Sequence, residues 1–344
     1  MKTVDAMKDP QALQPVYSTV DARDIRHLIE REYSIGEIGD CALLQCGFND
    51  IYEITLSDGR HCIARLSSRR ERGAPNVQYE TALLRHLKKG GAAVAEPWAT
   101  KNDALFVDFP ASKGERSLVL FEYLAGEPPG ENPDDIAAMG AELARIHTLS
   151  RTYHGPASAY TLDLDHLLRR PLARLLSLPA LDADMRDLLA SLAAEVEIRA
   201  AGFTNLKIVA CHGDCHGGNT IMTAGLQGSR TASFFDFDDG GPGFQAYDLA
   251  VYLWGGLLGK ALAEPDEELA AEWNAFFSAY LEILPVSDVD IQAISTFLTI
   301  RHFWLMGEYA SRAQRTGLRI FRAPWFRERV MLAQKWHSLV ISRP

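Results

Sequence analysis

A nine-residue segment rich in polar side chains follows the short apolar run at 208–210. It reads Cys211-His212-Gly213-Asp214-Cys215-His216-Gly217-Gly218-Asn219. Asp214 and Asn219 lie five residues apart on a glycine-rich loop that leaves a predicted strand. One carboxylate and one amide oxygen can therefore point at a common place, which is an arrangement suited to catalysis on a polar substrate.

Three carboxylates, those of Asp236, Asp238 and Asp239, follow a second apolar strand that begins after Asn219. Carboxylates at the end of an apolar strand are costly unless a cation or hydrogen-bond donors accompany them. Hard oxygen ligands beside the amide of Asn219 favour Mg²⁺ over zinc or copper. The plainer alternative is that Asp214 and Asp236 are structural carboxylates.

Two further patterns suggest sites but fit them poorly. Zinc ligands could come from Cys211, His212, Cys215 and His216. These four are packed so closely on one loop that they could hardly surround a tetrahedral ion. The segment 255–261 resembles a phosphate-binding loop, yet it is one residue short, ends in alanine and follows an apolar helix, so it predicts a helix end.

The composition is that of a globular protein, with 344 residues, 47% hydrophobic and 23% charged. The formal net charge of −10 disfavours nucleic acid or an anionic membrane as a partner. No stretch approaches the ~18 apolar residues of a membrane span, and the N-terminus lacks the apolar core of a secretion signal. Five cysteines at irregular spacing do not suggest a disulfide framework. We expect a cytoplasmic protein of unknown oligomeric state.

The first third of the chain predicts a sheet and the remainder predicts helices, so the expected fold class is α+β. A helix at 21–32 precedes a three-stranded antiparallel meander at 42–47, 51–57 and 61–66, a helix at 78–88, and strands at 94–100, 105–109 and 117–123. The segment 125–130 predicts a hinge. We therefore expect an N-terminal lobe over 1–124 and a helical C-terminal lobe over 125–344, with a ligand between them.

A period of about 3.6 residues begins at Pro133 and marks the helical lobe. Two helices are expected within 165–201 and four more at 245–262, 265–283, 288–312 and 325–340. Short strands are expected at 207–210, 220–222 and 231–237, with a hairpin turn at 224–228.

The His-x-Asp-x-x-x-x-Asn loop at 212–219 and the following Asp236 resemble the catalytic loop and metal aspartate of the aminoglycoside phosphotransferase family, relatives of the protein kinases. Tyr-Asp-Leu-Ala at 247–250, Leu-Ala-x-x-His at 143–147 and the segment 49–52 are also similar to that family. The resemblance covers roughly 40–255 and implies a bilobal protein-kinase-like fold that performs phosphoryl transfer.

The resemblance implies roles for individual residues of the loop. Asp214 would accept the proton of the substrate hydroxyl or orient it, and His212 would support the loop by hydrogen bonds. Asn219 and Asp236 would hold Mg²⁺ on the nucleotide phosphates, and Asp238 would be either a ligand or a supporting group. Asp248 would hold the catalytic loop from behind through backbone hydrogen bonds.

The nucleotide side departs from the pattern of a protein kinase. Arg65 occupies the place of the phosphate-binding cation, with Glu80 placed to pair with it, although a plain surface pair is the alternative. Asn49 follows a loop that has one glycine where a protein kinase has three. Backbone groups of Glu122 and Leu124 would read the purine.

Residues 301–344 carry nine basic and two acidic side chains. Our default expectation for Arg301, Arg312, Arg315, Arg319 and Arg322 is a solvated face. If some of these arginines face the cleft, they would favour an acceptor that carries a carboxylate or a phosphate.

We therefore expect a kinase that moves the γ-phosphate of ATP or GTP to a hydroxyl of a small molecule. An antibiotic is one candidate acceptor, and a metabolic acceptor such as homoserine, choline or hydroxylysine is another. A stress-response-type Ser/Thr protein kinase and a nucleotide-binding pseudokinase scaffold are the alternatives.

Overall fold

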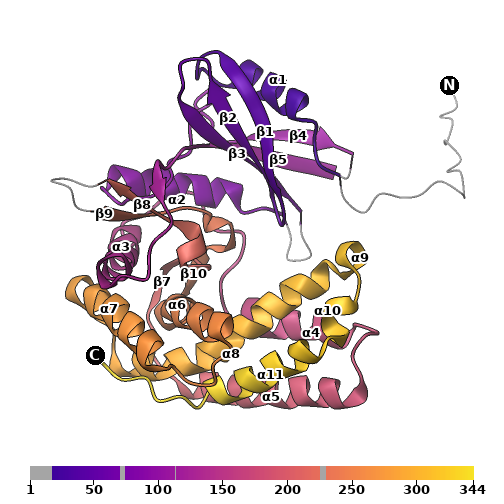
Figure 1. The fold of residues 1–344 in the computed structure, drawn as a ribbon, viewed down its shortest axis with the longest axis vertical. Coiled ribbons are helices and arrows are strands. Elements are labelled where there is room, and N and C mark those ends of the chain that lie inside the picture. Colours follow the sequence, from indigo (N-terminus) through magenta and orange to yellow (C-terminus); the bar gives the residue numbers. More distant parts are fainter. Residues whose placement is uncertain (1–17, 70–73, 113, 225–229) are drawn as a thin grey trace, which may run out of the picture.

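The computed structural model describes residues 18–69, 74–112, 114–224 and 230–344. Its first part is a five-stranded antiparallel sheet in the order β1-β2-β3-β5-β4, with one helix packed on it (Figure 1). These elements are α1 (Ala22–Glu32), β1 (Ile38–Cys46), β2 (Asp50–Leu56), β3 (His61–Ser68), β4 (Val107–Ala111) and β5 (Gly114–Glu122). The expected three-stranded meander is confirmed as β1-β2-β3.

Alternating burial explains how this sheet is built. Along β2 every second side chain is buried, as expected for a strand that presents one face to a core. The buried face packs against α1, whose first turn is capped by the Asp21 side chain, which accepts a hydrogen bond from Arg23 N. The other face of the sheet packs against α2 (Val77–Lys89), which belongs to the large core shared with the C-terminal helices.

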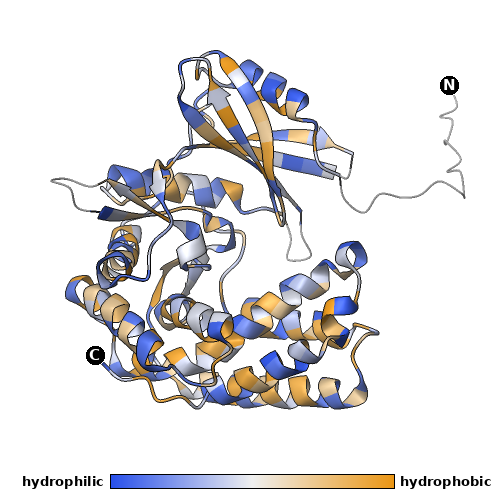
Figure 2. Ribbon diagram, in the orientation of Figure 1, coloured by the Kyte–Doolittle hydropathy of each residue, from blue (hydrophilic) through white to orange (hydrophobic). Residues whose placement is uncertain are grey.

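The second part is mainly helical and lies below the sheet in Figure 1. Its helices are α3 (Pro133–Ser150), α4 (Arg170–Leu176), α5 (Ala183–Gly202), α6 (Gln245–Lys260), α7 (Glu267–Ile283), α8 (Asp288–Ser311), α9 (Ala313–Thr316), α10 (Arg319–Arg322) and α11 (Pro324–Trp336), with a π-helical turn at Asp165–Arg169. Two small sheets complete it, β6-β8-β9 from Gly126–Glu127, Thr220–Ala224 and Arg230–Phe234, and β10-β7 from Gly241–Phe244 and Ile208–Cys211. Hydrophobic and hydrophilic residues alternate along the helices and strands (Figure 2).

Two sequence expectations need correction or lie outside the structure. The segment 94–100 is not a strand, because its backbone makes only isolated bridges at Val94, Pro97 and Thr100. The predicted turn at 224–228 falls largely outside the described residues, although β8 and β9 pair as an antiparallel hairpin would require. The division of the chain into lobes after residue 124 stays a prediction. Among the described residues, no helix has the length and apolar character needed to cross a membrane.

Helix α8 is the central helix of the C-terminal part and is buried along most of its length. Its polar side chains Arg301, His302 and Glu308 are buried with the apolar ones. A helix that is buried on nearly all sides shows no clear amphipathic stripe in the sequence. Its polar residues must therefore find partners in the interior, and one of them reaches the loop at 212–219.

Gly140 sets the distance between α3 and α7. A Cβ at this position would lie 2.0 Å from the Phe276 carbonyl oxygen, so any side chain would force the helices apart. We expect Gly140→Ala to lower the free energy of unfolding by about 1–3 kcal/mol, measured by urea unfolding. Gly259→Ala is the control, because a Cβ there meets nothing within 4 Å, and it should stabilise the protein slightly. Equal effects of the two substitutions would contradict this account.

His302 makes stability depend on pH. Burial, together with the nearby charges of Arg329 and Arg301, lowers its pKa from 6.5 to about 3, so the folded protein keeps this imidazole neutral. The unfolded chain takes up the proton below its ordinary pKa, so stability falls as the pH drops from 6.5 towards 3. We expect a loss of about 2 kcal/mol between pH 7 and pH 5 that His302→Phe removes, measured by urea unfolding at each pH. The same pH slope in the variant would assign the effect to other groups.

Candidate active site

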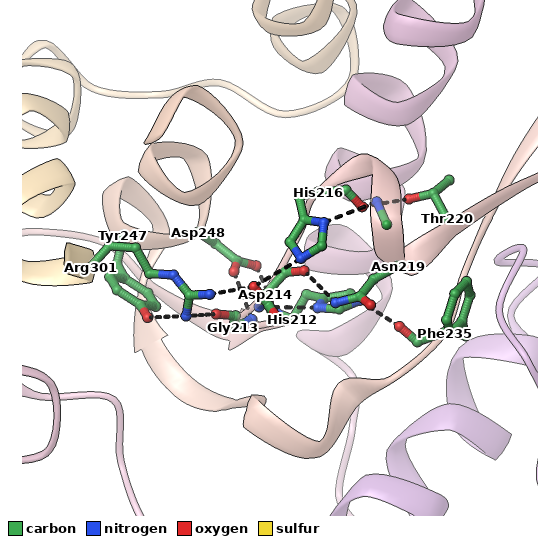
Figure 3. A network of polar contacts seen from close by, with 11 residues as sticks. His212, Gly213, Asp214, His216, Asn219, Thr220, Phe235, Tyr247, Asp248 and Arg301 are labelled. Atoms are coloured by element: carbon green, nitrogen blue, oxygen red, sulfur yellow. Dashed lines mark hydrogen bonds and ion pairs between the residues drawn. The ribbon is translucent and has the colours of Figure 1, made fainter. Parts of the chain in front are cut away.

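The loop at 212–219 is fixed from behind by a buried carboxylate. Asp248 on α6 accepts hydrogen bonds from the backbone N–H groups of His212 and Gly213, at 2.7 and 2.8 Å (Figure 3). It also accepts one from Nε2 of His147 at 2.8 Å, and neither side chain is exposed. Burial alone would raise the pKa of Asp248, but His147 and the backbone donors lower it. The expectation that Asp248 holds the loop by backbone hydrogen bonds is confirmed.

Gly213 gives the loop its sharp turn. Its φ of +84° lies in the left-handed region, and a Cβ would lie 2.2 Å from the Asp239 carbonyl oxygen. The close approach brings the loop against the segment 236–239. A side chain at 213 would separate the two segments that carry the polar residues of the site.

His212 supports the loop from inside the protein. Its Nδ1 accepts from the backbone N–H of Asp214 at 3.2 Å, and its Nε2 donates to the Phe235 carbonyl oxygen at 3.0 Å. These partners require the tautomer protonated at Nε2. Burial lowers the pKa of His212, although Asp248 and Asp214 oppose the shift. A neutral, fully buried ring with both nitrogens engaged is suited to holding the loop rather than to transferring a proton.

Asp214 has one carboxylate oxygen engaged and one open. Oδ1 pairs with Nη2 of Arg301 and lies 3.4 Å from Nε2 of His216. Oδ2 has no hydrogen-bond partner among the described residues, and the side chain is 22% exposed and lines the main cavity. Burial would raise the pKa of Asp214, but the charge of Arg301 and the hydrogen bond from His216 outweigh it and hold that pKa well below its ordinary value. Asp214 therefore presents an ionised oxygen to the cavity.

Asn219 and Asp236 lie close to Asp214 on the same cavity. Asn219 Nδ2 donates to the Asp214 carbonyl oxygen at 2.9 Å, which leaves its amide oxygen available. Asp236 has left-handed backbone angles, φ 62° and ψ 61°, and its side chain is 41% exposed. The part of the side chain that is open lines the cavity, and protein atoms enclose the rest. This enclosure and the neighbouring carboxylates raise the pKa of Asp236 to about 7, although Arg65 opposes the shift. Such crowding of negative charge fits a site for a cation.

The described residues contain no cluster of three or more His, Cys, Asp or Glu side chains able to hold a metal ion by themselves. Cys211, His212, Cys215 and His216 therefore do not form such a cluster in the described residues. Burial raises the pKa of the Cys211 and Cys215 thiols well above the ordinary value. One amide and one carboxylate, from Asn219 and Asp236, fit a hard cation that is completed by water and phosphate oxygens. Asp238 is buried and accepts from Asn49 Nδ2 at 3.0 Å, which ties the loop after β1 to this segment.

Arg65 links the sheet to the metal segment. Its guanidinium forms a two-pronged pair with Glu80 on α2, with Nη1 at 2.7 Å from Oε1, and Nη1 also lies 3.0 Å from Asp236 Oδ1. Arg65 is 3% and Glu80 1% exposed, so the surface-pair alternative is wrong. Burial lowers the pKa of Arg65, but the attraction of Glu80, Asp238 and Asp236 outweighs burial and raises it, so the side chain stays charged.

These residues surround one cavity of about 530 Å³. Apolar side chains of Ile51, Ile63 and Phe235 line it beside Glu122 and Leu124, where the sequence predicts the purine. Its lining also includes Asp214, Asp236, Asp238 and Asp239, together with Arg301 and Trp304 from α8. The structure thus places all ten candidate site residues in or beside this cavity or in direct contact with its lining: His212, Asp214, Arg65, Glu80, Asn49, Glu122, Leu124, Asn219, Asp236 and Asp238.

The expectation of a solvated basic face is wrong in part. Arg301 is 2% exposed and reaches Asp214, while Arg312 stacks on the Phe48 ring at 4.1 Å and Arg315 donates to the Gly47 carbonyl oxygen at 3.1 Å. Arg319 and Arg322 are exposed as expected. Sequence reasoning missed Arg301 as a site residue because its partner lies 87 residues away. The one available signal is a charged residue in the middle of an apolar helix.

We expect the buried Arg65–Glu80 pair to contribute much more to the free energy of unfolding than an exposed pair does. Glu80→Gln removes the main counter-charge of a buried guanidinium and should lower the free energy of unfolding by about 3 kcal/mol. Glu197→Gln, which disturbs the exposed pair with Arg169, should change it by less than about 1 kcal/mol. Urea unfolding of both variants measures the difference, and similar small losses would mean that Glu80 contributes little.

Comparisons with known proteins agree with this geometry. The model of the family described as "Phosphotransferase enzyme family" (APH) matches residues 47–284. An uncharacterized protein of Deinococcus radiodurans is 35% identical over 300 residues, which cover 86% of this chain and 84% of the relative. A homoserine kinase of Cupriavidus metallidurans is 24% identical over 80% of this chain and 82% of its own.

Solved structures show the same fold. An amicoumacin kinase in complex with AMP-PNP and Ca²⁺ superposes with a TM-score of 0.72 and 20% identity, over 94% of this chain and 96% of that one. The match confirms the expected α+β, protein-kinase-like fold. Together with the family match over most of the chain, it confirms the resemblance drawn from the motifs. The chain belongs to the phosphotransferase enzyme family (APH) and is a kinase-type enzyme whose acceptors are alcohol groups.

Proposed function

We propose that the protein transfers the γ-phosphate of ATP, with Mg²⁺, to a hydroxyl of a small molecule. The observation that carries this proposal is the open Oδ2 of Asp214, which faces the cavity lined also by Asn219 and Asp236. A hydroxyl that donates to Oδ2 is held beside the place where the cation and the phosphates would lie. Phosphoryl transfer needs mainly such positioning and charge neutralisation.

The metal would be held by Asn219 Oδ1 and the Asp236 carboxylate. When bound, Mg²⁺ neutralises phosphate charge and fixes the phosphates in place. The chain contributes the position of its two oxygen ligands: Asn219 is anchored to the Asp214 carbonyl oxygen, and Asp236 is held by Arg65. The two anchors lie on separate elements. The relative position of the two metal ligands therefore depends on the contact between these elements.

The nucleotide would lie along the sheet side of the cavity. Backbone groups of Glu122 and Leu124 would read the purine, as expected from the resemblance, and the surrounding apolar side chains would cover the ring. Arg65 would bring positive charge to the phosphates from its place between Glu80 and Asp236. Asn49 would hold the loop after β1 over them through its bond to Asp238. A purine site of this kind is open to ATP and GTP, and we propose ATP.

The charge at the acceptor end favours a small alcohol that also carries an amino group. The cavity lining includes the carboxylate of Asp239, which is not among the groups proposed to hold the metal or the nucleotide. Arg301 is the cation on this side, but its donors are directed to Asp214, Gly213 and Tyr247. An anionic acceptor would need an arginine that can bind it, and Arg301 already binds these three partners. A hydroxy amino acid related to homoserine or an amino-bearing antibiotic related to amicoumacin fits the acidic end.

A peptide acceptor is less favoured. Contacts from Arg312 to Phe48 and from Arg315 to Gly47 bridge the cleft between the end of α8 and the loop after β1. This bridge narrows the cleft on the side where a protein substrate would lie. A pseudokinase would not need the anchored set of Asp214, Asn219 and Asp236.

Release of ADP from Mg-ATP tests the proposal. The purified protein would be assayed with homoserine, choline, hydroxylysine, 1-amino-2-propanol, aminoglycosides, amicoumacin and a generic protein substrate, and with GTP in place of ATP. We expect stimulation by an amino-bearing alcohol and a loss of at least about 100-fold in kcat for Asp214→Asn. Nucleotide binding should remain in this variant.

Asp165→Asn is the matched control, because Asp165 forms an exposed pair with Arg170 away from the cavity. Its turnover should equal that of the original protein. Intact binding of Mg-ATP without turnover on any acceptor would support the scaffold alternative. Stimulation only by the protein substrate would support the protein-kinase alternative.

A further inference from the structure

Arg301 joins a central helix to the catalytic loop. From α8 its guanidinium reaches the turn at Gly213, where Nη1 donates to the carbonyl oxygen at 3.1 Å and to the Tyr247 hydroxyl at 3.4 Å (Figure 3). Nη2 forms the ion pair with Oδ1 of Asp214. The planar guanidinium of Arg301 thus binds both the backbone of the loop at Gly213 and the carboxylate of Asp214.

Two tryptophan rings leave this guanidinium little freedom. Its Cζ lies 4.9 Å from the ring centre of Trp254 on α6 and 4.3 Å from that of Trp304 on α8. Guanidinium groups stack on aromatic faces, where attraction to the ring adds to close packing. Trp254 and Trp304 are 5% and 4% exposed, so neither ring can move aside into solvent without opening the core. The direction of the Nη2 atom is therefore set by the fold.

Arg301 pairs with only one of the two carboxylate oxygens of Asp214, and this has a chemical consequence. Arg301 and His216 both approach Oδ1 of Asp214, and the backbone N–H and carbonyl of Asp214 are bound by His212 and Asn219. Oδ2 is the remaining polar atom of the residue, whose side chain lines the cavity and is 22% exposed. We propose that Arg301 is a positioning residue that fixes the Asp214 carboxylate with Oδ2 towards the acceptor hydroxyl. This role rests on the proposed function of Asp214 in phosphoryl transfer.

A purely structural role does not explain the arrangement as well. A buried arginine needs a counter-charge, and carboxylates that serve stability alone are normally buried with it, as Asp50 is with Arg116. The partner of Arg301 is instead a carboxylate that is open to the cavity. Rigid support of a reacting group by a neighbour with a locked conformation is how active sites hold their geometry.

Arginine and lysine should differ at this position. A lysine could supply the charge, but it has no planar fork to serve Gly213, Tyr247 and Asp214 together, and it would not fill the slot between the rings. If charge alone matters, Arg301→Lys would restore function. If position matters, the lysine variant would resemble Arg301→Met.

The test compares three variants in the same assays. Arg301→Met and Arg301→Lys address the proposal, and Arg174→Met is the matched control, because Arg174 pairs with the buried Glu308 on the same helix at 3.0 Å, away from the cavity. Each variant is measured for ADP release from Mg-ATP with homoserine and with 1-amino-2-propanol, for slow hydrolysis to water, for Mg-ATP affinity and for urea stability. A crystal structure of Arg301→Met with Mg-ADP shows the Asp214 side chain.

We expect Arg301→Met to lower kcat about 100-fold, with Mg-ATP affinity and the KM for ATP within about threefold of the original values. Arg301→Lys should recover less than about a tenth of the lost rate. Arg174→Met should lose stability and keep its kcat. In the crystal structure the Asp214 carboxylate should leave its original orientation while the loop backbone stays in place.

Unchanged kcat in Arg301→Met, or equal losses of kcat in the Arg301 and Arg174 variants, would overturn the proposal. Full recovery of kcat in Arg301→Lys would overturn the positioning role and show that only the charge of residue 301 matters. If the original protein releases no ADP with any acceptor or with water, the proposed function fails, and the crystal structure still decides the role of Arg301. In that structure, an Asp214 side chain that keeps its original orientation in Arg301→Met would overturn the positioning role of Arg301.

Discussion

The geometry of the site depends on one buried carboxylate, that of Asp248. It binds the N–H groups of His212 and Gly213, and His147 holds it from the other side. His147 is in turn bound by Tyr280, whose hydroxyl also accepts from Gln245. A charge without exposure is tolerable only when donors surround it, so removing any one of these donors weakens the others. The position of Asp214 follows from this network, because Asp214 is the next residue of the loop.

A second constraint comes from charge in the cavity. Arg65 lies among Glu80, Asp236 and other carboxylates, and the negative charge around it exceeds its own. Burial and this excess of negative charge together raise the pKa of Asp236. The site therefore carries an excess of negative charge, which a bound cation would offset. The ion pairs of Arg65 with Glu80 and Asp236 therefore contribute to stability and also shape the candidate site, as is common where pKa values are shifted.

The sequence alone predicted the parts of the site that are encoded locally. Asp214 and Asn219 lie on one loop, and their spacing showed that they could converge. Asp248 could be assigned to the loop only through the resemblance, because nothing in its own segment indicates a partner 36 residues away. The segment 94–100 was misjudged because its apolar residues fill a core without pairing as a strand. Burial from tertiary packing overrides the local preference in such cases.

Arg301 shows where prediction from sequence ends. A run of five arginines in the last quarter of the chain suggests a solvated face, since charged side chains are rarely buried without partners. Which of them has a partner depends on where α8 crosses the catalytic loop, and this is a property of the packed helices. The two tryptophans beside Arg301 lie on α6 and α8, so they meet only when these helices pack. The residue that pairs with the Asp214 carboxylate is therefore specified by the helical core, and substitutions in that core should reach the loop at 212–219 through it.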